Sequence, residues 1–524
     1  MYSKVVRCKL FHYFVMLVQR FYFLFLLVSV NVECAKILGV FYVPTRSHYI
    51  ASSTLMKVLA ERGHEVTVMS PFKEPQPPEN YTEIYLDGLL RGSKSRSVNY
   101  FKEHEPFKMA WSYSSLSTSF LNRTMSHPKF QKLLKQNSTF DVVIVEQFNC
   151  DALFYLATHF KAPLIGLSTL DASPFSNKYV GNPTFPSYIP DLYFPFHHMT
   201  FWQRIQNMFM YVIKELLFRF ETLPAQNEIL QYNIPGAPRI EEFMYNSSIV
   251  FLNGDLSIHD AVPKVPSMIN IGGFHINAPK PLPEDLQELL DNSTSGVIIF
   301  SLGASVKSKH MPAEKLQAIL STFSKMNETI LWKWEDDNLP GKSSNIHTRK
   351  WLPQQDILRH PNVKVFITHG GLLSMMESIY NGKPMLAIPI MTDQHWNTAR
   401  AEAAGYAKYL EFSKITASSF SEALTELLQN PSYKKTAEKR SSIMRNKPVS
   451  ARETIVYWVE NISKNRGAPH LRVSSIDMPW YQFMMLDVIA LLLIPPIIFI
   501  LCIIFTIKYL VKYYKVRRGK RKLN

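Results

Sequence analysis

The sequence predicts an α/β fold in which two doubly wound parallel sheets face each other across a cleft, followed by a membrane-spanning helix. Three observations predict it. A chain of 524 residues is long enough for two globular domains. Short apolar runs rich in β-branched residues alternate with helical patterns in both halves. Residues 488–507 carry no charge, and this length crosses the hydrocarbon core of a bilayer.

The net charge of +16 is concentrated at the two ends of the chain. Residues 508–524 hold eight Lys and Arg and no acid, and residues 1–35 carry a net +3, which leaves +5 for the body. This distribution indicates targeting segments and membrane flanks, and nucleic acid is not an expected partner. Of the four cysteines, Cys150 alone lies in the predicted body, so no disulfide framework or cysteine metal site is expected there.

Residues 1–35 are predicted to be a signal peptide, because basic residues precede an apolar run at 21–30. A retained anchor is the alternative, although this run is short for a bilayer span. The basic tail 508–524 after the span at 488–507 predicts a lumenal body and a cytosolic tail. A buried core helix is the alternative for 488–507, and the basic tail disfavours it. Lys520 and Lys522 resemble a retrieval signal for the endoplasmic reticulum.

The first domain is predicted at 36–262. A strand at 37–43 is followed by a loop, a helix over 49–62 that His48 opens, and a strand at 65–69. Further strands are predicted at 141–145, 163–167 and 249–253, and the last of these closes the sheet. No G-x-G-x-x-G follows the first strand, which disfavours a nicotinamide or flavin oxidoreductase.

Two stretches of this domain are less regular. Residues 71–130 carry no firm pattern. Residues 175–220 are rich in Pro and aromatic residues, which favours an apolar pocket or a membrane-facing surface, with ordinary core packing as the alternative.

A linker is predicted at 263–275, where prolines and glycines gather, and a second domain at 276–464. Its strands are predicted at 297–301, 329–334, 363–368 and 385–390, with helices at 312–323, 372–380 and within 417–464. A juxtamembrane segment, 465–487, precedes the span.

Four polar residues stand at the carboxyl ends of predicted strands: His48, Glu146, Ser301 and His369. Open α/β sheets bind ligands at that edge. With two such sheets face to face, the four side chains are expected to line one cleft.

The stretch 351–394 combines three kinds of group. The strand 363–368, the turn His369-Gly370-Gly371 and the helix 372–380 form an anion site, since the first N–H groups of a helix lack partners. Trp351 offers a flat apolar face for a base. Hydrogen-bonding side chains complete the stretch, namely Gln354, Glu377, Asp393 and Gln394. Together these groups predict a nucleotide-sugar site.

This stretch resembles the signature of the membrane-bound UDP-glycosyltransferases. The matching residues are Phe366, Thr368, His369, Gly371, Ser374, Glu377, Pro384, Pro389, Asp393 and Gln394. The alternative, any doubly wound βαβ unit with a glycine turn, explains Gly370 and Gly371 and leaves the other groups unexplained. The resemblance implies the GT-B architecture of two facing Rossmann-like domains, with the last helix of the second domain returning to the first.

The resemblance also implies roles for the residues of the site. Trp351 is expected to stack on uracil, with Gln354 and Glu377 on the base or ribose. Ser301, His369 and Gly371 are expected to bind the phosphates. Asp393 and Gln394 are expected to bind the sugar hydroxyls.

For catalysis, His48 is expected to be the general base, because its pKa lies near the operating pH. Glu146 stands where the family usually has Asp, so Asp151 is kept as the alternative partner of His48. No D-x-D occurs in the chain, so a metal-bound diphosphate is not expected, nor is any cofactor beyond the UDP-sugar co-substrate.

These interpretations combine into an inverting UDP-glycosyltransferase acting on a hydroxyl of a small lipophilic acceptor, in the endoplasmic reticulum membrane. Leu373 and Gln355 resemble arthropod members, which favours UDP-glucose over UDP-glucuronate. The alternative is a non-catalytic lipophile-binding or scaffolding membrane protein that keeps the fold. The oligomeric state is left open, a homo-oligomer included.

Overall fold

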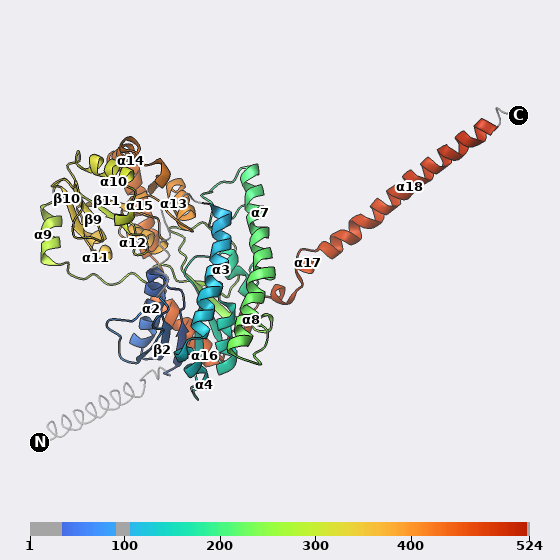
Figure 1. The fold of residues 1–524 in the computed structure, drawn as a ribbon, viewed down its shortest axis with the longest axis horizontal. Helices are drawn as coiled ribbons and strands as arrows, with labels where there is room; N and C mark the ends of the chain where they lie inside the picture. Colours follow the sequence, from blue (N-terminus) through green and yellow to red (C-terminus); the bar gives the residue numbers. More distant parts are fainter. Residues whose placement is uncertain (1–33, 91–104, 521–524) are drawn as a thin grey trace, which may run out of the picture.

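The computed structural model describes residues 34–90 and 105–520. It contains two α/β domains beside each other, with one long helix projecting from the body (Figure 1). The predicted signal peptide, apart from Cys34 and Ala35, lies outside the described residues, as does Lys522 of the retrieval signal.

The first sheet has seven parallel strands in the order β3-β2-β1-β4-β5-β6-β7. Central strands such as β4 and β5 are apolar and buried on both faces, as expected for a parallel sheet covered on both sides. The strands are β1 (Lys36–Val40), β2 (Glu65–Ser70), β3 (Tyr81–Tyr85), β4 (Val142–Glu146), β5 (Leu164–Ser168), β6 (Ser247–Leu252) and β7 (Met268–Asn270).

The prediction that 249–253 closes this sheet is wrong, because β7 pairs in parallel with β6. This strand lies inside 263–275, which was predicted to be a linker. It was missed because it has three residues, of which Met268 alone is buried, so it shows no period. The helix after β1 also begins at Arg46, three residues before its predicted start.

The second sheet has six parallel strands in the order β10-β9-β8-β11-β12-β13. The predicted strands 297–301 and 363–368 are confirmed with the same bounds. The strands are β8 (Val297–Ser301), β9 (Thr329–Lys333), β10 (Ile346–Arg349), β11 (Val363–Thr368), β12 (Met385–Ala387) and β13 (Ala407–Tyr409).

Helices cover both faces of the first sheet, because its strand residues point alternately to the two sides. Ile37 packs with α2, and the adjacent Leu38 packs with α3, α4 and α8 in a separate core. The helices of this domain are α2 (Arg46–Glu61), α3 (Pro106–Met125), α4 (Pro128–Lys135), α5 (Tyr155–Phe160), α6 (Pro174–Asn177), α7 (Phe201–Leu217) and α8 (Leu223–Asn233).

The second sheet is covered in the same way. Phe300 packs toward α10 and α14, whereas the adjacent Ile299 packs toward α11, α12 and α15. The helices are α9 (Glu284–Asn292), α10 (Ala313–Phe323), α11 (Gln354–Arg359), α12 (Leu372–Tyr380), α13 (Gln394–Ala403), α14 (Ala417–Gln429) and α15 (Pro431–Arg445).

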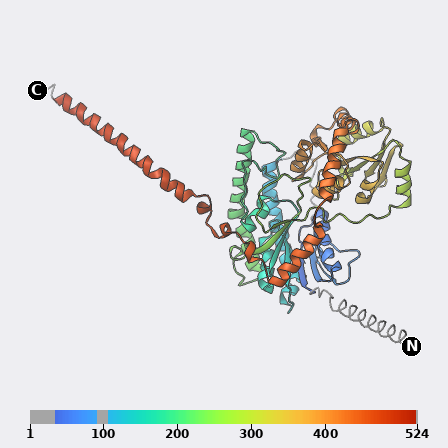
Figure 2. The ribbon, with the colours of Figure 1, turned by 180° about the vertical axis from the view of Figure 1, so that it is seen from behind.

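Helix α16 (Ala451–Asn465) follows the second domain in sequence but packs on α2 and β4 of the first (Figure 2). Ile455, Val459 and Ile462 lie at helical spacing and are fully buried in the core that contains Ile37. The chain therefore crosses between the domains at this helix as well as after β7.

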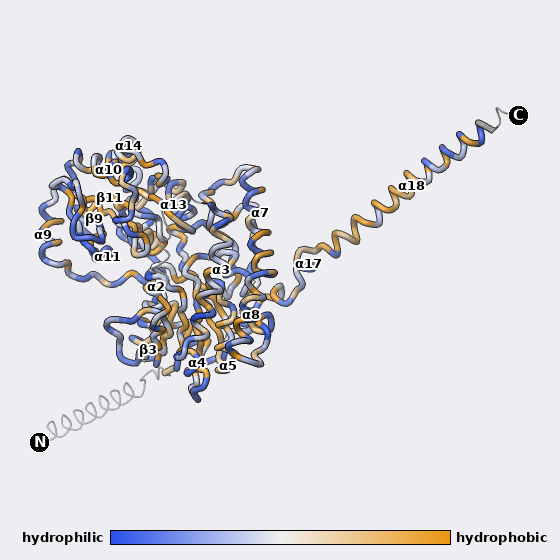
Figure 3. Tube along the Cα trace, viewed as in Figure 1, coloured by the Kyte–Doolittle hydropathy of each residue, from blue (hydrophilic) through white to orange (hydrophobic). Residues whose placement is uncertain are grey.

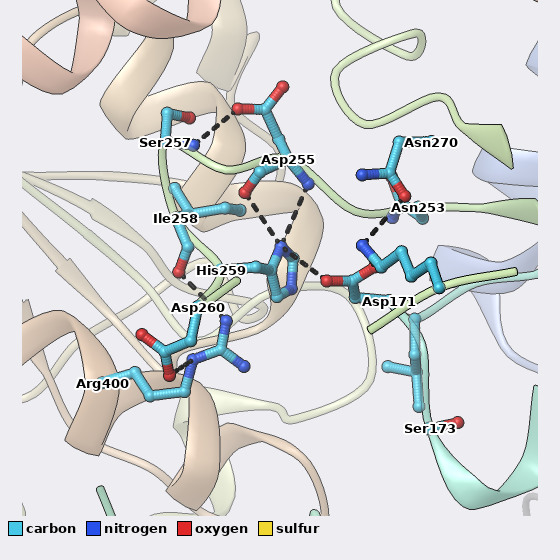
Figure 4. Close-up of polar contacts among 12 residues, drawn as sticks. Asp171, Ser173, Asn253, Asp255, Ser257, Ile258, His259, Asp260, Asn270 and Arg400 are labelled. Atoms are coloured by element: carbon cyan, nitrogen blue, oxygen red, sulfur yellow. Dashed lines mark hydrogen bonds and ion pairs between the residues drawn. The ribbon is translucent and has the colours of Figure 1, made fainter. Parts of the chain in front are cut away.

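A polar network joins the domains beside this crossing (Figure 4). Arg400 of α13 donates to the carbonyl of Ile258 at 3.1 Å and lies 3.4 Å from Asp260, both in the loop after β6. Burial and then the charge of Arg400 lower the pKa of His259 to about 4, so this histidine is neutral. The network anchors α13, which begins at Gln394, to the first domain.

Helix α18 (Leu486–Lys520) contains the one stretch of the described chain that is long and apolar enough to cross a membrane, Leu486–Arg518. This helix projects straight out from the two domains, and its first half is strongly hydrophobic (Figure 3). The short helix α17 (Trp480–Phe483) precedes it.

Candidate functional site

The first half of the site is a hydrogen-bonded pair from two elements of the first sheet. His48 is the third residue of α2, and Glu146 is the last residue of β4, the strand next to β1. Nδ1 of His48 is hydrogen-bonded to a carboxylate oxygen of Glu146, which is 1% exposed. The longer side chain of Glu therefore reaches the imidazole at this position.

The environment of His48 favours its protonated form. Burial lowers the pKa of His48, but the charge and the hydrogen bond of Glu146, with a further contribution from Asp393, outweigh burial. The pKa of His48 is therefore raised above 6.5. A carboxylate that orients an imidazole and stabilises its charged form is the arrangement of a catalytic triad.

Asp151, the alternative partner of His48, is engaged elsewhere. Its carboxylate accepts hydrogen bonds from Tyr179 and from Gln226, the latter at 3.1 Å, and lies 3.7 Å from Nζ of Lys178. Asp151 is fully buried in this network. The geometry therefore pairs Glu146, and not Asp151, with His48.

Aromatic side chains extend from His48 toward a cavity. The ring of Phe148 lies edge-on to His48 at 5.2 Å and contacts Phe175 and Tyr113 at 6.1 and 6.2 Å between centroids. Phe175 and Tyr113 line a small hollow, partly open to solvent, between α3, α6 and α7. The charged side chains of Lys178, Asp191, Lys214 and Glu215 also line this hollow. Its aromatic part suits an apolar portion of a ligand.

The second half of the site begins at His369, directly after β11. A Cβ atom at Gly303 would lie 2.5 Å from the His369 ring, and one at Gly371 would lie 2.7 Å from it. Two glycine turns therefore enclose this imidazole. Burial, followed by the charge of Lys333, lowers the pKa of His369 to about 4, so the imidazole is neutral at physiological pH.

The turn after β8 is stabilised by Ser301. Its buried hydroxyl accepts from the backbone N–H of Gly303 at 3.3 Å. Gly303 has φ of +78°, a conformation that glycine adopts without strain. Ser301 thus shapes the loop that faces His369.

Trp351, Gln354 and Glu377 lie on neighbouring elements of the second domain. Trp351 is 60% exposed, and Nζ of Lys333 lies 5.8 Å from its ring centroid. Gln354 donates to Glu377 at 2.6 Å, and Gln355 donates to the other carboxylate oxygen at 3.0 Å. Burial raises the pKa of Glu377 to about 7, against these two hydrogen bonds.

Asp393 and Gln394 lie at the start of α13. Asp393 accepts from Thr392 at 2.9 Å and from Asn397 at 2.7 Å. The side-chain oxygen of Gln394 accepts from the backbone N–H groups of Ile390 and Met391, each at 2.9 Å. Gln394 therefore holds the loop after β12 in place.

An electrostatic interaction links His48 of the first domain with Asp393 of the second. Burial raises the pKa of Asp393, and the positive charge of His48 opposes this rise. The charge of Asp393 in turn raises the pKa of His48, so the two groups interact across the domain junction. The four predicted strand-end residues thus divide into a pair in each domain, and Asp393 connects the second domain to the first pair.

Three residues of the site were not predicted. Lys333 ends β9 and donates to the carbonyl of Gly303 at 2.9 Å. Thr169 follows β5 and lies 3.5 Å from Nδ1 of His48, and Phe148 lies beside the same ring. Two of these residues had a signal in the sequence: Lys333 is a lysine in an apolar run, and Thr169 is a hydroxyl residue after a strand end.

Within the described ranges, no three His, Cys, Asp or Glu side chains lie together as they would in a metal site.

Two α/β domains, each built on a parallel sheet, form the GT-B architecture. Solved structures share the fold at low sequence identity. A UDP-glucosyltransferase from Polygonum tinctorium has a TM-score of 0.58 at 15% identity, covering 82% of this chain and 99% of that one. The glycosyltransferase VinC, in complex with DTDP, has a TM-score of 0.55 at 16% identity, covering 82% and 100%.

The model of the family "UDP-glucoronosyl and UDP-glucosyl transferase" matches residues 36–522, and the chain belongs to this family. UDP-glycosyltransferase UGT5 of Dactylopius coccus is 36% identical over 94% of this chain and 95% of its own length. UDP-glucuronosyltransferase 2B19 of Macaca fascicularis is 31% identical over 90% and 92%. The relatives thus include both glucuronosyl- and other UDP-glycosyltransferases.

Proposed function

We propose that this protein transfers glucose from UDP-glucose to a hydroxyl of a small lipophilic acceptor, with inversion at the anomeric carbon. The observation that carries the proposal is the His48–Glu146 pair, which adjoins the ring of Phe148 and interacts with the charge of Asp393.

In the proposed step, Nδ1 of His48 is held by Glu146, which leaves Nε2 for the acceptor hydroxyl. Nε2 takes the proton while the acceptor oxygen forms a bond to the anomeric carbon. The bond from that carbon to the β-phosphate oxygen breaks, and UDP leaves from the opposite face with the electron pair. Glu146 stabilises the imidazolium that forms.

On the donor side, Trp351 would stack on uracil, and Glu377 would accept from the ribose hydroxyls. The diphosphate would lie on the backbone N–H groups of the two glycine turns around His369, where fixed dipoles stabilise the charge of the departing group. Asp393 would accept from the sugar hydroxyls, and its electrostatic interaction with His48 supports an anomeric carbon on the His48 side of the site.

Glucose is proposed as the donor sugar because Leu373 and Gln355 follow the arthropod-like pattern. "UDP-glucosyltransferase 2" of Dactylopius coccus is 32% identical over 92% of the chain, and UDP-glucuronosyltransferase 2B19 is 31% identical over 90%, so the choice of glucose depends on this pattern. The rings of Phe148, Phe175 and Tyr113, which extend from His48 to the hollow, support a lipophilic acceptor.

We also propose that α18 spans the endoplasmic reticulum membrane once, with the body in the lumen. Its apolar first half and the basic residues from Lys508 onward support this orientation.

The experiment compares the wild-type full chain with His48→Ala, using UDP-glucose, UDP-glucuronate and a panel of phenols. His470→Ala, at an exposed residue outside the site, is the matched control. Turnover with UDP-glucose that is lost in His48→Ala and kept in His470→Ala supports the proposal. Turnover that His48→Ala leaves unchanged would overturn His48 as the base. A wild type that lacks turnover would favour a non-catalytic lipophile-binding protein. Preference for UDP-glucuronate would overturn the choice of sugar alone.

A further inference from the structure

Helix α7 has its polar and apolar sides reversed relative to a helix of a water-soluble body. Its inward side carries Asn207, which accepts from the backbone N–H of Asp191 at 2.7 Å. The amide of Asn207 also donates to the carbonyls of Pro186 and Ile189 at 2.7 and 2.9 Å. One and two turns further along the helix, Met210 and Lys214 continue this side, and Lys214 pairs with Asp191 at 2.7 Å.

The outward side of α7 is apolar. At about 100° per residue, these positions fall within less than half of the helix circumference. The exposed members are Phe201, Trp202, Met208, Phe209, Val212 and Leu216. Trp202 is 72% exposed, and Phe220, in the π-helical segment Phe218–Thr222 that follows, is 78% exposed.

This orientation is set by specific contacts. Rotating α7 to bury its apolar side would break the hydrogen bonds of Asn207 and expose the pair of Lys214 and Asp191. An apolar surface of this extent is unfavourable in water and indicates an interaction surface. We call the outward residues listed above the α7 face.

The position of the α7 face indicates what covers it. In Figures 1 and 2, α7 (green) runs along the side of the first domain from which α18 departs. The segment before α18 is held to the same domain, because Ser475 donates to the carbonyl of Gly181 and Arg472 to that of Tyr245. A span that begins at Leu486 therefore starts within a short length of chain from this side.

The composition of both segments fits the interface between lipid and water. The exposed residues Trp480, Tyr481 and Phe483 lie just before the span, where aromatic residues are enriched in membrane proteins. Arg204 and Arg219 are exposed near the two ends of the α7 face, and Arg219 is paired with Glu215 on the same helix. Such long basic side chains can extend toward lipid headgroups while the apolar side chains enter the acyl region.

We infer that the α7 face lies in the leaflet of the bilayer that α18 spans, so that the first domain is docked on the membrane and not merely tethered to it. This inference rests on the membrane placement in the proposed function.

The test uses the full chain in phosphatidylcholine nanodiscs, with single spin labels in a background where the cysteines other than the buried Cys150 are replaced by serine. Phe209→Cys places the label on the α7 face. Gln206→Cys, exposed on the same helix but outside that face, is the matched control. Leu493→Cys, in α18, reports the span. Each label is scored by its collision rates with oxygen, which enters lipid, and with a water-soluble nickel complex.

The expected result is a ratio of oxygen to nickel collisions that is several-fold higher at 209 than at 206, and also high at 493. A label at Val212 should repeat the result at 209. A label at 209 that meets the nickel complex as often as one at 206 would overturn the docking, and so would shielding from both reagents, which indicates a protein partner or a second copy. A label at 493 in water would overturn the membrane placement together with the docking. This test does not measure sugar transfer, so its result on docking is independent of whether the proposed reaction occurs.

Discussion

Nδ1 of His48 is hydrogen-bonded to the carboxylate of Glu146, which lies 98 residues further along the chain. The pair forms because β1 and β4 are adjacent in the sheet, so the residues that follow one strand and end the other meet at one edge. Glu146 raises the pKa of His48 against the effect of burial, which makes the imidazole a stronger base.

Replacing Glu146 by Gln should lower kcat by about 10²–10⁴-fold, because the imidazolium loses its carboxylate. The same change should lower the pKa of His48. A general base works in its neutral form, so activity falls as pH falls below that pKa, and the acid limb of kcat/KM should move to lower pH. The measurement is kcat/KM as a function of pH for the wild type and for Glu146→Gln.

Asp151→Asn is the control for this experiment. It should lower the melting temperature, because Asp151 is buried with Tyr179 and Gln226, but it should leave the acid limb in place. An acid limb that Glu146→Gln does not move would show that Glu146 does not set the pKa of His48.

Replacing Gly303 by Ala should weaken UDP binding by tenfold or more. The new Cβ would lie 2.5 Å from the ring of His369, which must shift. Gly341→Ala is matched in backbone conformation, with φ of +75° against +78°, but its nearest neighbour lies at 3.8 Å. Both variants should lose about 1 kcal/mol of stability. Calorimetry with UDP distinguishes them, and equal affinities in the two variants would contradict the role of the His369 loop.

Uridine should bind more tightly as pH rises through about 7, because burial raises the pKa of Glu377 to about 7 and the ionised carboxylate is the better acceptor for ribose hydroxyls. Uridine replaces UDP here because a terminal phosphate titrates in the same range. The Kd measured from pH 6 to 8 should fall in the wild type and stay nearly flat in Glu377→Gln. A Kd that rises with pH would mean that the protonated carboxyl group donates to the nucleoside.

Replacing Trp351 by Ala should weaken UDP binding by about 10–100-fold, the range expected for loss of a base stacked on an aromatic ring. Trp351→Phe should retain part of the affinity. The melting temperature should change little, because Trp351 is 60% exposed. Trp480→Ala removes a side chain of nearly equal exposure, 59%, and should leave UDP affinity unchanged. A similar loss of affinity in both variants would contradict stacking.

Strands in the middle of each sheet could be predicted from the sequence, because an apolar run buried on both faces is nearly continuous. Val297–Ser301 and Val363–Thr368 are examples. Edge strands were missed. β3, β7 and β10 each carry partly exposed or polar residues, and β7 is three residues long, so neither period nor length identifies them.

The sequence by itself determined the two-domain α/β class, the helix that begins close to His48, the strand that His369 follows, and the apolar helix near the C-terminus. Each of these depends on the local order of residue types. Tertiary structure alone decided that Glu146 and not Asp151 contacts His48, that Lys333 reaches the loop at Gly303, and that the apolar side of α7 faces outward. These outcomes depend on which strands are neighbours and on which side of a helix makes the stronger contacts, and residues far apart in the chain settle both.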